Sequence, residues 1–176
     1  MAHPNLQAKL DAIFQAHMSA ELAGDLDQTL ATMAPNPHLV NVPTMVGGQG
    51  AAGVRAFYAN RLIGQFFPPD VRFETVSRTY SEERLVDELI ISFTHNQKID
   101  WMLPGVEPTG RFVDVVFVVI VGIENDKVAY EHILWDQANV LVQIGLLDPT
   151  GLPVTGAGAA AKLRDARLPD PFFQES

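Results

Sequence analysis

Three polar side chains at the ends of apolar segments could carry out proton transfer. They are His95, His132 and Asp136. His132 and Asp136 are four residues apart in an expected strand, so both should point to one face of it. A carboxylate in an apolar pocket has a raised pKa because of desolvation, and a nearby imidazole can hold a substrate oxygen or share the proton. We therefore predict that the three residues are catalytic, with His95 as the partner of the other two across the sheet.

Each of these residues also has a purely structural explanation. Asp136 precedes the segment 137–139, where a helix is expected to begin, so its carboxylate could cap that helix, alone or in addition to a catalytic role. His132 could face solvent beside Glu131, and His95 could be a turn residue at the end of a strand. These alternatives stay open at the level of sequence.

Four further side chains are predicted to contact a substrate: His17, Tyr58, Trp101 and Trp135. His17 lies on an apolar stripe of the first expected helix, flanked by Phe14 and Met18. Trp101 belongs to a long loop, 96–109, and long loops of this kind often form lids or pocket rims. The competing explanations are a satisfied histidine in the core and ordinary core aromatics.

Acidic residues inside the expected strands are further candidates for a site. Asp87 shares a strand face with Leu89 and His95, whereas Glu88 lies on the opposite face, and Asp114 lies in the next strand. The sequence does not decide which face of each strand meets a cavity. A surface ion pair is the favoured interpretation for each acid.

Several familiar motifs are excluded. The run from Gly48 to Gly53 matches Gly-x-Gly-x-x-Gly before a helix, but the strand before it is broken by Pro43, and antiparallel hairpins rather than crossover units follow. The five histidines show no His-x-His or His-Glu-x-x-His spacing, and the chain has neither a Gly-x-Ser-x-Gly segment nor a cysteine. We therefore expect no metal and no cofactor.

The elements that must position these residues are helices first and strands afterwards. Apolar spacing predicts a first helix around residues 6–18, a second from Asp25 to Met33 and a third over 51–64. A short strand is expected at 38–42 and a glycine turn at 47–50. Four strands are expected at 71–80, 84–95, 110–123 and 127–137, with later helices at 140–147 and 157–166. Tight turns between consecutive strands predict an α+β fold with a curved antiparallel sheet against the N-terminal helices.

The composition limits the possible partners. The chain has 176 residues, 47% of them hydrophobic, and a formal net charge of −9, with no basic cluster, so nucleic acid is not an expected partner. The longest apolar stretch, 115–121, is too short to cross a bilayer, and the N-terminal residues do not resemble a signal peptide. We expect a cytoplasmic protein that does not bind membranes.

Several segments together resemble the SnoaL-like polyketide cyclase family. They are Phe93-Thr-His-Asn96, Leu103-Pro-Gly-Val-Glu-Pro-Thr-Gly-Arg111, Asp126-Lys-Val-Ala-Tyr-Glu-His132, Trp135-Asp-Gln-Ala-Asn-Val-Leu-Val-Gln-Ile-Gly145 and Gly24-Asp-Leu-Asp27. Residues 149–176 are rich in Gly, Ala and Pro and lie beyond the resemblance, and we expect them to form an extension that packs on the domain or on a partner subunit. The resemblance itself implies a cone of the nuclear-transport-factor-2-like type over residues 1–148, with an internal pocket. It also implies a homodimer or larger homo-oligomer, a small hydrophobic ligand, and an acid/base aspartate, carried over to Asp136.

Three functions compete at this point. The first is a cofactor-independent enzyme of aldol-cyclase or isomerase type acting on a hydrophobic carbonyl compound. The second resembles limonene epoxide hydrolase or scytalone dehydratase, with an Asp–Arg–Asp set drawn from Arg111, Asp114 and Asp136. The third is a ligand-binding domain without catalysis, because function does not follow from fold.

Overall fold

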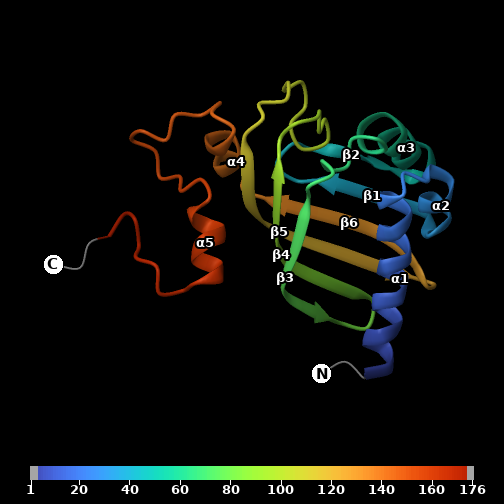
Figure 1. Cartoon of the computed structure of the whole chain (residues 1–176). Coiled ribbons are helices and arrows are strands. Elements are labelled where there is room, and N and C mark those ends of the chain that lie inside the picture. The colour runs from blue at the N-terminus through green and yellow to red at the C-terminus, as the bar shows by residue number, and fades with distance from the viewer. Residues whose placement is uncertain (1–3, 174–176) are drawn as a thin grey trace.

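The computed structural model describes residues 4–173 and places the helices on a curved six-stranded sheet (Figure 1). In chain order the elements are α1 (Pro4–Leu22), α2 (Leu26–Ala31), β1 (Met33–Asn41), β2 (Val46–Gln49), α3 (Gly50–Phe57), a π-helical turn η1 (Tyr58–Leu62), β3 (Arg72–Tyr80), β4 (Arg84–Thr94), β5 (Phe112–Glu124), β6 (Lys127–Trp135), α4 (Gln137–Gln143) and α5 (Gly158–Arg164). Among residues 4–173, no helix combines the length and apolar character needed to cross a bilayer.

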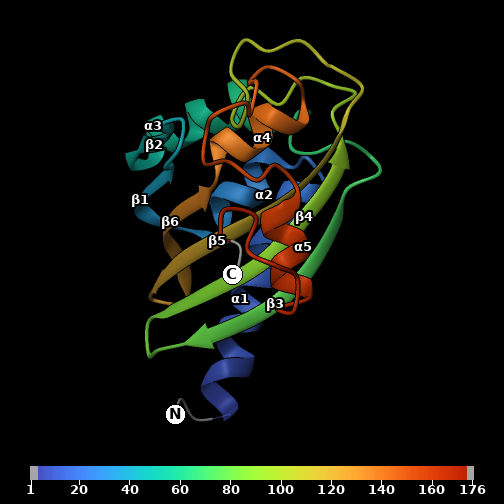
Figure 2. The same cartoon turned by 90° about the vertical axis from the view of Figure 1, so that its left-hand side faces the viewer.

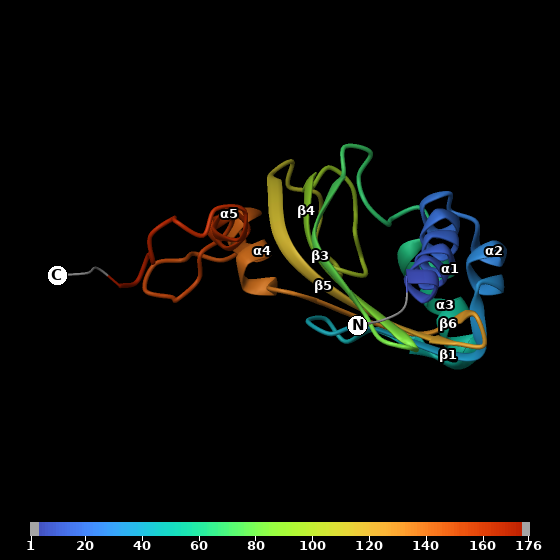
Figure 3. The same cartoon turned by 90° about the horizontal axis from the view of Figure 1, so that it is seen from below.

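The sheet has the strand order β2-β1-β6-β5-β4-β3 and is open at both edges. The four strands from β3 to β6 pair antiparallel, as predicted, and the α+β cone is confirmed. The complete sheet is mixed, because β1 runs parallel to β6. A tight hairpin imposes antiparallel pairing, whereas β1 and β6 are far apart in the chain and are free to pair either way. Figure 3 shows the sheet curving around α1 and α3.

Strand alternation defines the concave face that meets the helices. On β4 the buried side chains Leu85, Asp87, Leu89, Ile91 and Phe93 share this face. The same face of β5 and β6 and the apolar stripe of α1 close one core, since all contribute to a single cluster of buried hydrophobic residues.

Two boundaries differ from the prediction for local reasons. The second helix stops at Ala31 and β1 begins at Met33, so Pro35 and Pro37 lie inside a strand rather than after a helix. Pairing between β1 and β6 is interrupted between Met33 and His38, which is where prolines without an N–H can be accommodated. The expected glycine turn at 47–50 is instead mostly strand β2, paired with β1.

The glycines of the excluded dinucleotide motif serve close packing. β1 and β2 form an antiparallel hairpin, not the first strand of a crossover unit. A Cβ atom added at Gly48 would lie 2.4 Å from the carbonyl carbon of Gly53, so the start of α3 packs directly on β2.

The C-terminal segment lies on the convex side of the sheet, and Figure 2 shows α5 in front of the strands and α1 behind them. The side chain of Asn139 in α4 accepts hydrogen bonds from the backbone N–H groups of Thr155 and Gly156, both at 2.8 Å. Arg164 in α5 pairs with Asp114 on β5 and Glu74 on β3. The division into a domain of residues 1–148 and an extension of 149–176 stays a prediction.

Two glycine substitutions test this packing. Gly48→Ala should lower the free energy of unfolding by about 1–3 kcal/mol, because its methyl group meets backbone atoms that cannot move aside. In Gly53→Ala the added methyl group lies 3.7 Å from Gly48, which is an ordinary van der Waals distance. Because alanine is favoured over glycine inside a helix, this variant should raise that free energy by about 0.5–1 kcal/mol. Urea unfolding measures both values, and equal effects of the two variants would contradict the packing argument.

Candidate functional site

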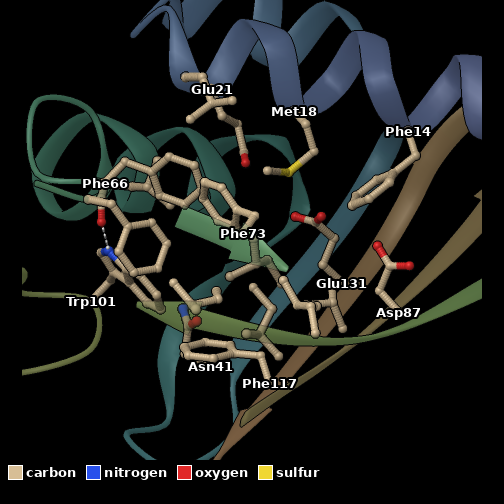
Figure 4. A pocket seen from close by; sticks show the side chains of 18 of the residues that line it. Phe14, Met18, Glu21, Asn41, Phe66, Phe73, Asp87, Trp101, Phe117 and Glu131 are labelled. Atoms are coloured by element: carbon tan, nitrogen blue, oxygen red, sulfur yellow. Dashed lines mark hydrogen bonds between the residues drawn. The ribbon is translucent and has the colours of Figure 1, made fainter. Parts of the chain in front are cut away.

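A cavity of about 240 Å³ lies between α1 and the concave face of the sheet (Figure 4). Four exposed side chains among its lining residues form the rim, and they are Gln15, Leu22, Phe73 and Thr75. Its polar lining deeper inside consists of Glu21, Asn41, Arg78, Asp87 and Glu131. The remaining lining residues are apolar, so a few polar groups project into a hydrophobic space, as is usual for small-molecule sites.

One wall of the cavity is aromatic. Phe66, Phe67, Trp101 and Phe117 line it, and their rings contact one another, with centroid distances of 5.2 Å for Phe67–Trp101 and 6.4 Å for Trp101–Phe117. The indole N–H of Trp101 donates to the carbonyl oxygen of Phe66 at 2.9 Å, which fixes the loop against the segment after η1. Trp135 stacks behind this wall on Phe117, with centroids 5.3 Å apart.

A buried polar cluster joins α1, η1 and β6 beside the cavity. The Nε2 atom of His17 lies 3.2 Å from Glu21 Oε1 and 3.5 Å from Glu131 Oε2. The hydroxyl of Tyr58 lies 2.6 Å from Glu21 Oε1 and 3.3 Å from Glu131 Oε2. All four side chains are at most 4% exposed, so each depends on the others to satisfy its polar atoms.

The ring orientation of His17 is fixed from its other side. The Thr32 hydroxyl lies 2.6 Å from the carbonyl oxygen of Thr29, to which it donates, and 2.6 Å from His17 Nδ1. Because the hydroxyl proton is used on Thr29, the threonine oxygen accepts from Nδ1–H. The nitrogen that gains or loses a proton is therefore Nε2, which faces the two carboxyl groups.

Burial and charge act against each other in this cluster. Burial by itself lowers the pKa of His17, but the charges and hydrogen bonds of Glu21 and Glu131 outweigh it and raise that pKa to about 10. Burial raises the pKa of Glu21, opposed by the positive charge of His17. An imidazolium between two carboxyl groups, one of which favours its protonated form, is thus the expected state near neutral pH.

The same atoms have the donor types of a metal site. One ligand atom each from His17, Glu21 and Glu131 lies within 4.8 Å of the others, a grouping hidden from spacing rules because the third ligand comes from a distant strand. A divalent ion would have to displace the proton that His17 holds on Nε2.

A second charged cluster lies at the other side of the cavity. Arg78 on β3 donates to both carboxylate oxygens of Asp87 on β4 and to Asp11 of α1, the latter at 2.7 Å. The hydrogen bonds to Asp87 raise the pKa of Arg78 further above its usual range. The Tyr80 hydroxyl donates to Asp11 at 2.8 Å. Arg78 is therefore neutralised by two carboxylates of the protein.

Asn41 supplies a polar atom that no described residue satisfies. Its side-chain N–H donates to the carbonyl oxygen of Val46 at 3.1 Å. Its Oδ1 is buried on the cavity wall and accepts no hydrogen bond from residues 4–173 (Figure 4). A buried carbonyl oxygen without a donor is costly, so this atom is an unsatisfied acceptor in the wall of the cavity.

The structure does not bring His95, His132 and Asp136 together. In the strand registers His132 pairs with Ile120, which pairs with Val86, and His95 lies nine residues further along β4, about 30 Å away. The expected pairing across the sheet is therefore wrong. None of the three is among the residues that line the cavity.

Each of the three has another structural role or setting. Asp136 is exposed and caps α4, accepting from the backbone N–H of Asn139 at 3.0 Å. His132 lies on the convex face, where its Nε2 is 3.1 Å from Nε2 of His38. His95 is buried, its Nδ1 is 3.2 Å from the Thr109 hydroxyl, and burial lowers its pKa. Their catalytic role stays a prediction without support from this geometry.

The predicted substrate-contacting residues lie closer to the cavity. Trp101 lines it, whereas Trp135, His17 and Tyr58 form the layer directly behind its wall. Sequence reasoning missed Glu21 and Glu131. Glu21 could have been found, because it follows His17 by one helical turn. Glu131 was missed because the wrong face of β6 was assigned to the pocket, a shift of one residue.

The second hypothetical set, from Arg111, Asp114 and Asp136, is not assembled at the cavity. Asp114 accepts from Ser92 at 2.7 Å and pairs with Arg164 of the C-terminal segment. Neither Asp114 nor Arg111 is among the cavity-lining residues. An Asp–Arg–Asp arrangement does exist at the cavity, but it is Asp11–Arg78–Asp87.

Comparison with known structures supports the class of fold. A candidate SnoaL-like polyketide cyclase from Jannaschia sp. CCS1 is 16% identical and superposes with a TM-score of 0.65 over 84% of this chain and 99% of its own. AclR, a candidate hydroxylase from Streptomyces galilaeus, is 20% identical, with a TM-score of 0.58 over 80% and 98%. An NTF2-like protein of unknown function from Burkholderia pseudomallei K96243 is also 20% identical, with a TM-score of 0.56 over 77% and 97%.

The fold and its enclosed cavity define a pocket protein of the nuclear-transport-factor-2-like cone class. The sequence profile of the SnoaL-like domain matches residues 14–131, so the chain belongs to the SnoaL-like family, which confirms the resemblance seen in the sequence. No curated protein matches the chain.

The raised pKa of His17 predicts a pH dependence of stability. Between the ordinary value of 6.5 and the folded value of about 10, the folded chain holds a proton that the unfolded chain has lost. The contribution is therefore full below the lower value and disappears as the pH rises through the upper one, with a slope of about 1.4 kcal/mol per pH unit in between. Urea unfolding at several pH values should show this slope in the wild type and a shallower one in His17→Gln. Equal slopes would contradict the ion cluster.

The capping role of Asp136 predicts a contrast between two variants. Asp136→Ala should lower the free energy of unfolding by about 1 kcal/mol, whereas Asp136→Asn should change it by only a few tenths, because asparagine caps helices as well as aspartate. Thermal or urea unfolding checks both values. Loss of turnover in Asp136→Asn at unchanged stability would instead support the catalytic prediction.

Proposed function

We propose that this protein is a cofactor-independent acid/base enzyme that moves a proton on a small hydrophobic carbonyl compound, in a reaction of isomerase or aldol-cyclase type. The observation that carries the proposal is the pair of carboxyl groups, Glu21 and Glu131, which share a buried cluster at the wall of a mainly apolar cavity. Proton abstraction beside a carbonyl needs one base and one proton donor at such a place.

The two carboxyl groups are suited to different roles. Burial raises the pKa of Glu21, and this effect is opposed by the charge of His17 and by the hydrogen bond that the Tyr58 hydroxyl donates. Because its pKa is raised on balance, Glu21 is the proton donor that stabilises a developing enolate oxygen. Glu131 projects from β6 next to His17 and acts as the base. A pair of carboxyl groups with different surroundings is a recurring arrangement in proton-transfer sites.

The cavity volume limits the substrate. Small-molecule pockets usually enclose about 300–1,000 Å³, and an apolar cavity of about 150 Å³ holds one benzene ring. A volume of about 240 Å³ therefore suits a compound of one or two rings. The aromatic wall of Phe66, Phe67, Trp101 and Phe117 favours a flat one.

Support from related proteins is of a general kind. One structural neighbour is a candidate polyketide cyclase, which agrees with a carbonyl substrate, and another is a candidate hydroxylase. We expect a homodimer or larger homo-oligomer, as the resemblance to the family implied, and a cytoplasmic location, as the sequence features suggested.

Exchange of α-hydrogens tests the proposal without knowledge of the natural substrate. The wild type should catalyse hydrogen–deuterium exchange into 2-tetralone, a two-ring ketone, measured by NMR in heavy water. Glu131→Gln should lose about 10²–10⁴-fold in rate, because it removes the base and keeps the shape. Glu124→Gln, the same change at an exposed position at the end of β5, should keep the wild-type rate. Wild-type exchange in Glu131→Gln, or no exchange by the wild type on several one- and two-ring ketones, would overturn the proposal.

A second candidate function rests on Asp11–Arg78–Asp87. In this reading the set activates a water for addition to an epoxide, as the resemblance to limonene epoxide hydrolase suggested for other residues. Arg78 already donates to both oxygens of Asp87, so this carboxylate is engaged by the protein before any water binds. Diol formation from styrene oxide that is abolished by Asp87→Asn and kept in Glu131→Gln would favour this candidate over proton transfer.

A further inference from the structure

We propose that the cavity selects a ligand that carries a protonated amine, with the ammonium group between the aromatic wall and Asn41. This inference deepens the proposed function, since it names a feature of the substrate bound in the same cavity. It rests on the charge of the cavity, on its unsatisfied acceptor and on its aromatic rings.

The charged groups around the cavity are mainly acidic. Glu21, Glu131 and Asp87 line it, and Asp11 lies behind Arg78, whereas His17 and Arg78 are the cationic side chains of the two clusters. Four carboxyl groups thus face two cations, and the balance stays negative even with a proton on Glu21. A cation entering this low-dielectric space is favoured over a neutral group, and an anion is disfavoured.

The hydrogen-bonding groups of the wall point to the same choice. The nitrogen donors deeper in the cavity already donate to the protein: Trp101 to Phe66, Asn41 to Val46, and Arg78 to its two carboxylates. The atom left without a partner among the described residues is an acceptor, Asn41 Oδ1, on a side chain that is fully buried. A ligand that donates a hydrogen bond satisfies this atom, and a ligand that only accepts does not.

The aromatic wall is placed to receive the positive charge. Asn41 projects into the cavity near Phe117, and Trp101 and Phe66 close the same end, as Figure 4 shows. Ring faces attract ammonium groups, most strongly in sites shielded from water. An anionic ligand would instead need Arg78, whose charge two carboxylates already neutralise.

Three probes with one ring and one short chain test the inference on the full-length protein. They are 2-phenylethylamine, 2-phenylethanol and 3-phenylpropanoate, which carry a positive, a neutral and a negative end. Isothermal titration near pH 7 should show the amine binding about tenfold more tightly than the alcohol, with the carboxylate weakest. Equal binding of amine and alcohol, or tighter binding of the carboxylate, would overturn the inference.

A matched pair of variants locates the effect. Asp87→Asn removes one negative charge from the cavity wall and should weaken amine binding about threefold or more while leaving alcohol binding unchanged. Glu88→Gln removes a charge from the opposite face of the same strand and should leave both unchanged. If Asp87→Asn does not fold, Asn41→Leu takes its place. This variant removes the acceptor oxygen and should likewise weaken the binding of the amine more than that of the alcohol. Amine affinity that is insensitive to the cavity variants would overturn the assignment.

The test separates this inference from the proposed function, because 2-tetralone exchange involves no amine. Exchange that depends on Glu131, together with equal amine and alcohol binding, would overturn the amine inference alone. A clear preference for the amine without any exchange would support the amine inference and overturn the proposed enzyme activity.

Discussion

The cavity between α1 and the sheet depends on the buried hydrogen bonds and ion pairs around His17. One helix supplies His17 and Glu21, η1 supplies Tyr58, and β6 supplies Glu131, so a single buried cluster ties the helical layer to the sheet. Removing one partner would leave a charged or polar group buried without compensation, which costs far more than the net value of the intact pair. These groups therefore depend on one another, and their position next to a mainly apolar cavity allows them to react with a bound molecule.

The cavity itself has two polar sides separated by apolar surface. The His17 cluster lies beside one part of the cavity and the Arg78–Asp87 pair beside another, and the rings of Phe117 and Trp101 belong to its aromatic wall. Such a division orients a ligand as well as binding it, because each end of the ligand meets a different environment. The negative balance of charge adds a preference that shape alone would not give.

Membership of the SnoaL-like family determines the cone but leaves the reaction open. Neighbours with the same fold include a candidate cyclase and a candidate hydroxylase. In this fold the sheet and α1 supply a hollow, and the side chains that face inward decide the chemistry. The residues at issue here are Glu21 and Glu131, together with the unsatisfied oxygen of Asn41.

The sequence by itself determined the order and type of the main elements, since hydrophobic spacing and turn residues act locally. It also placed Asp25 at the start of the second helix and offered Asp136 as the cap of a later one, because an N-cap depends on the few residues that follow it. Only the tertiary structure decided which face of β6 meets the cavity. Glu131 and His132 are neighbours in the chain and lie on opposite faces of β6, and no local pattern tells which face is buried. The parallel pairing of β1 with β6 was decided in the same way, by packing between segments too distant in the chain to leave a local signal.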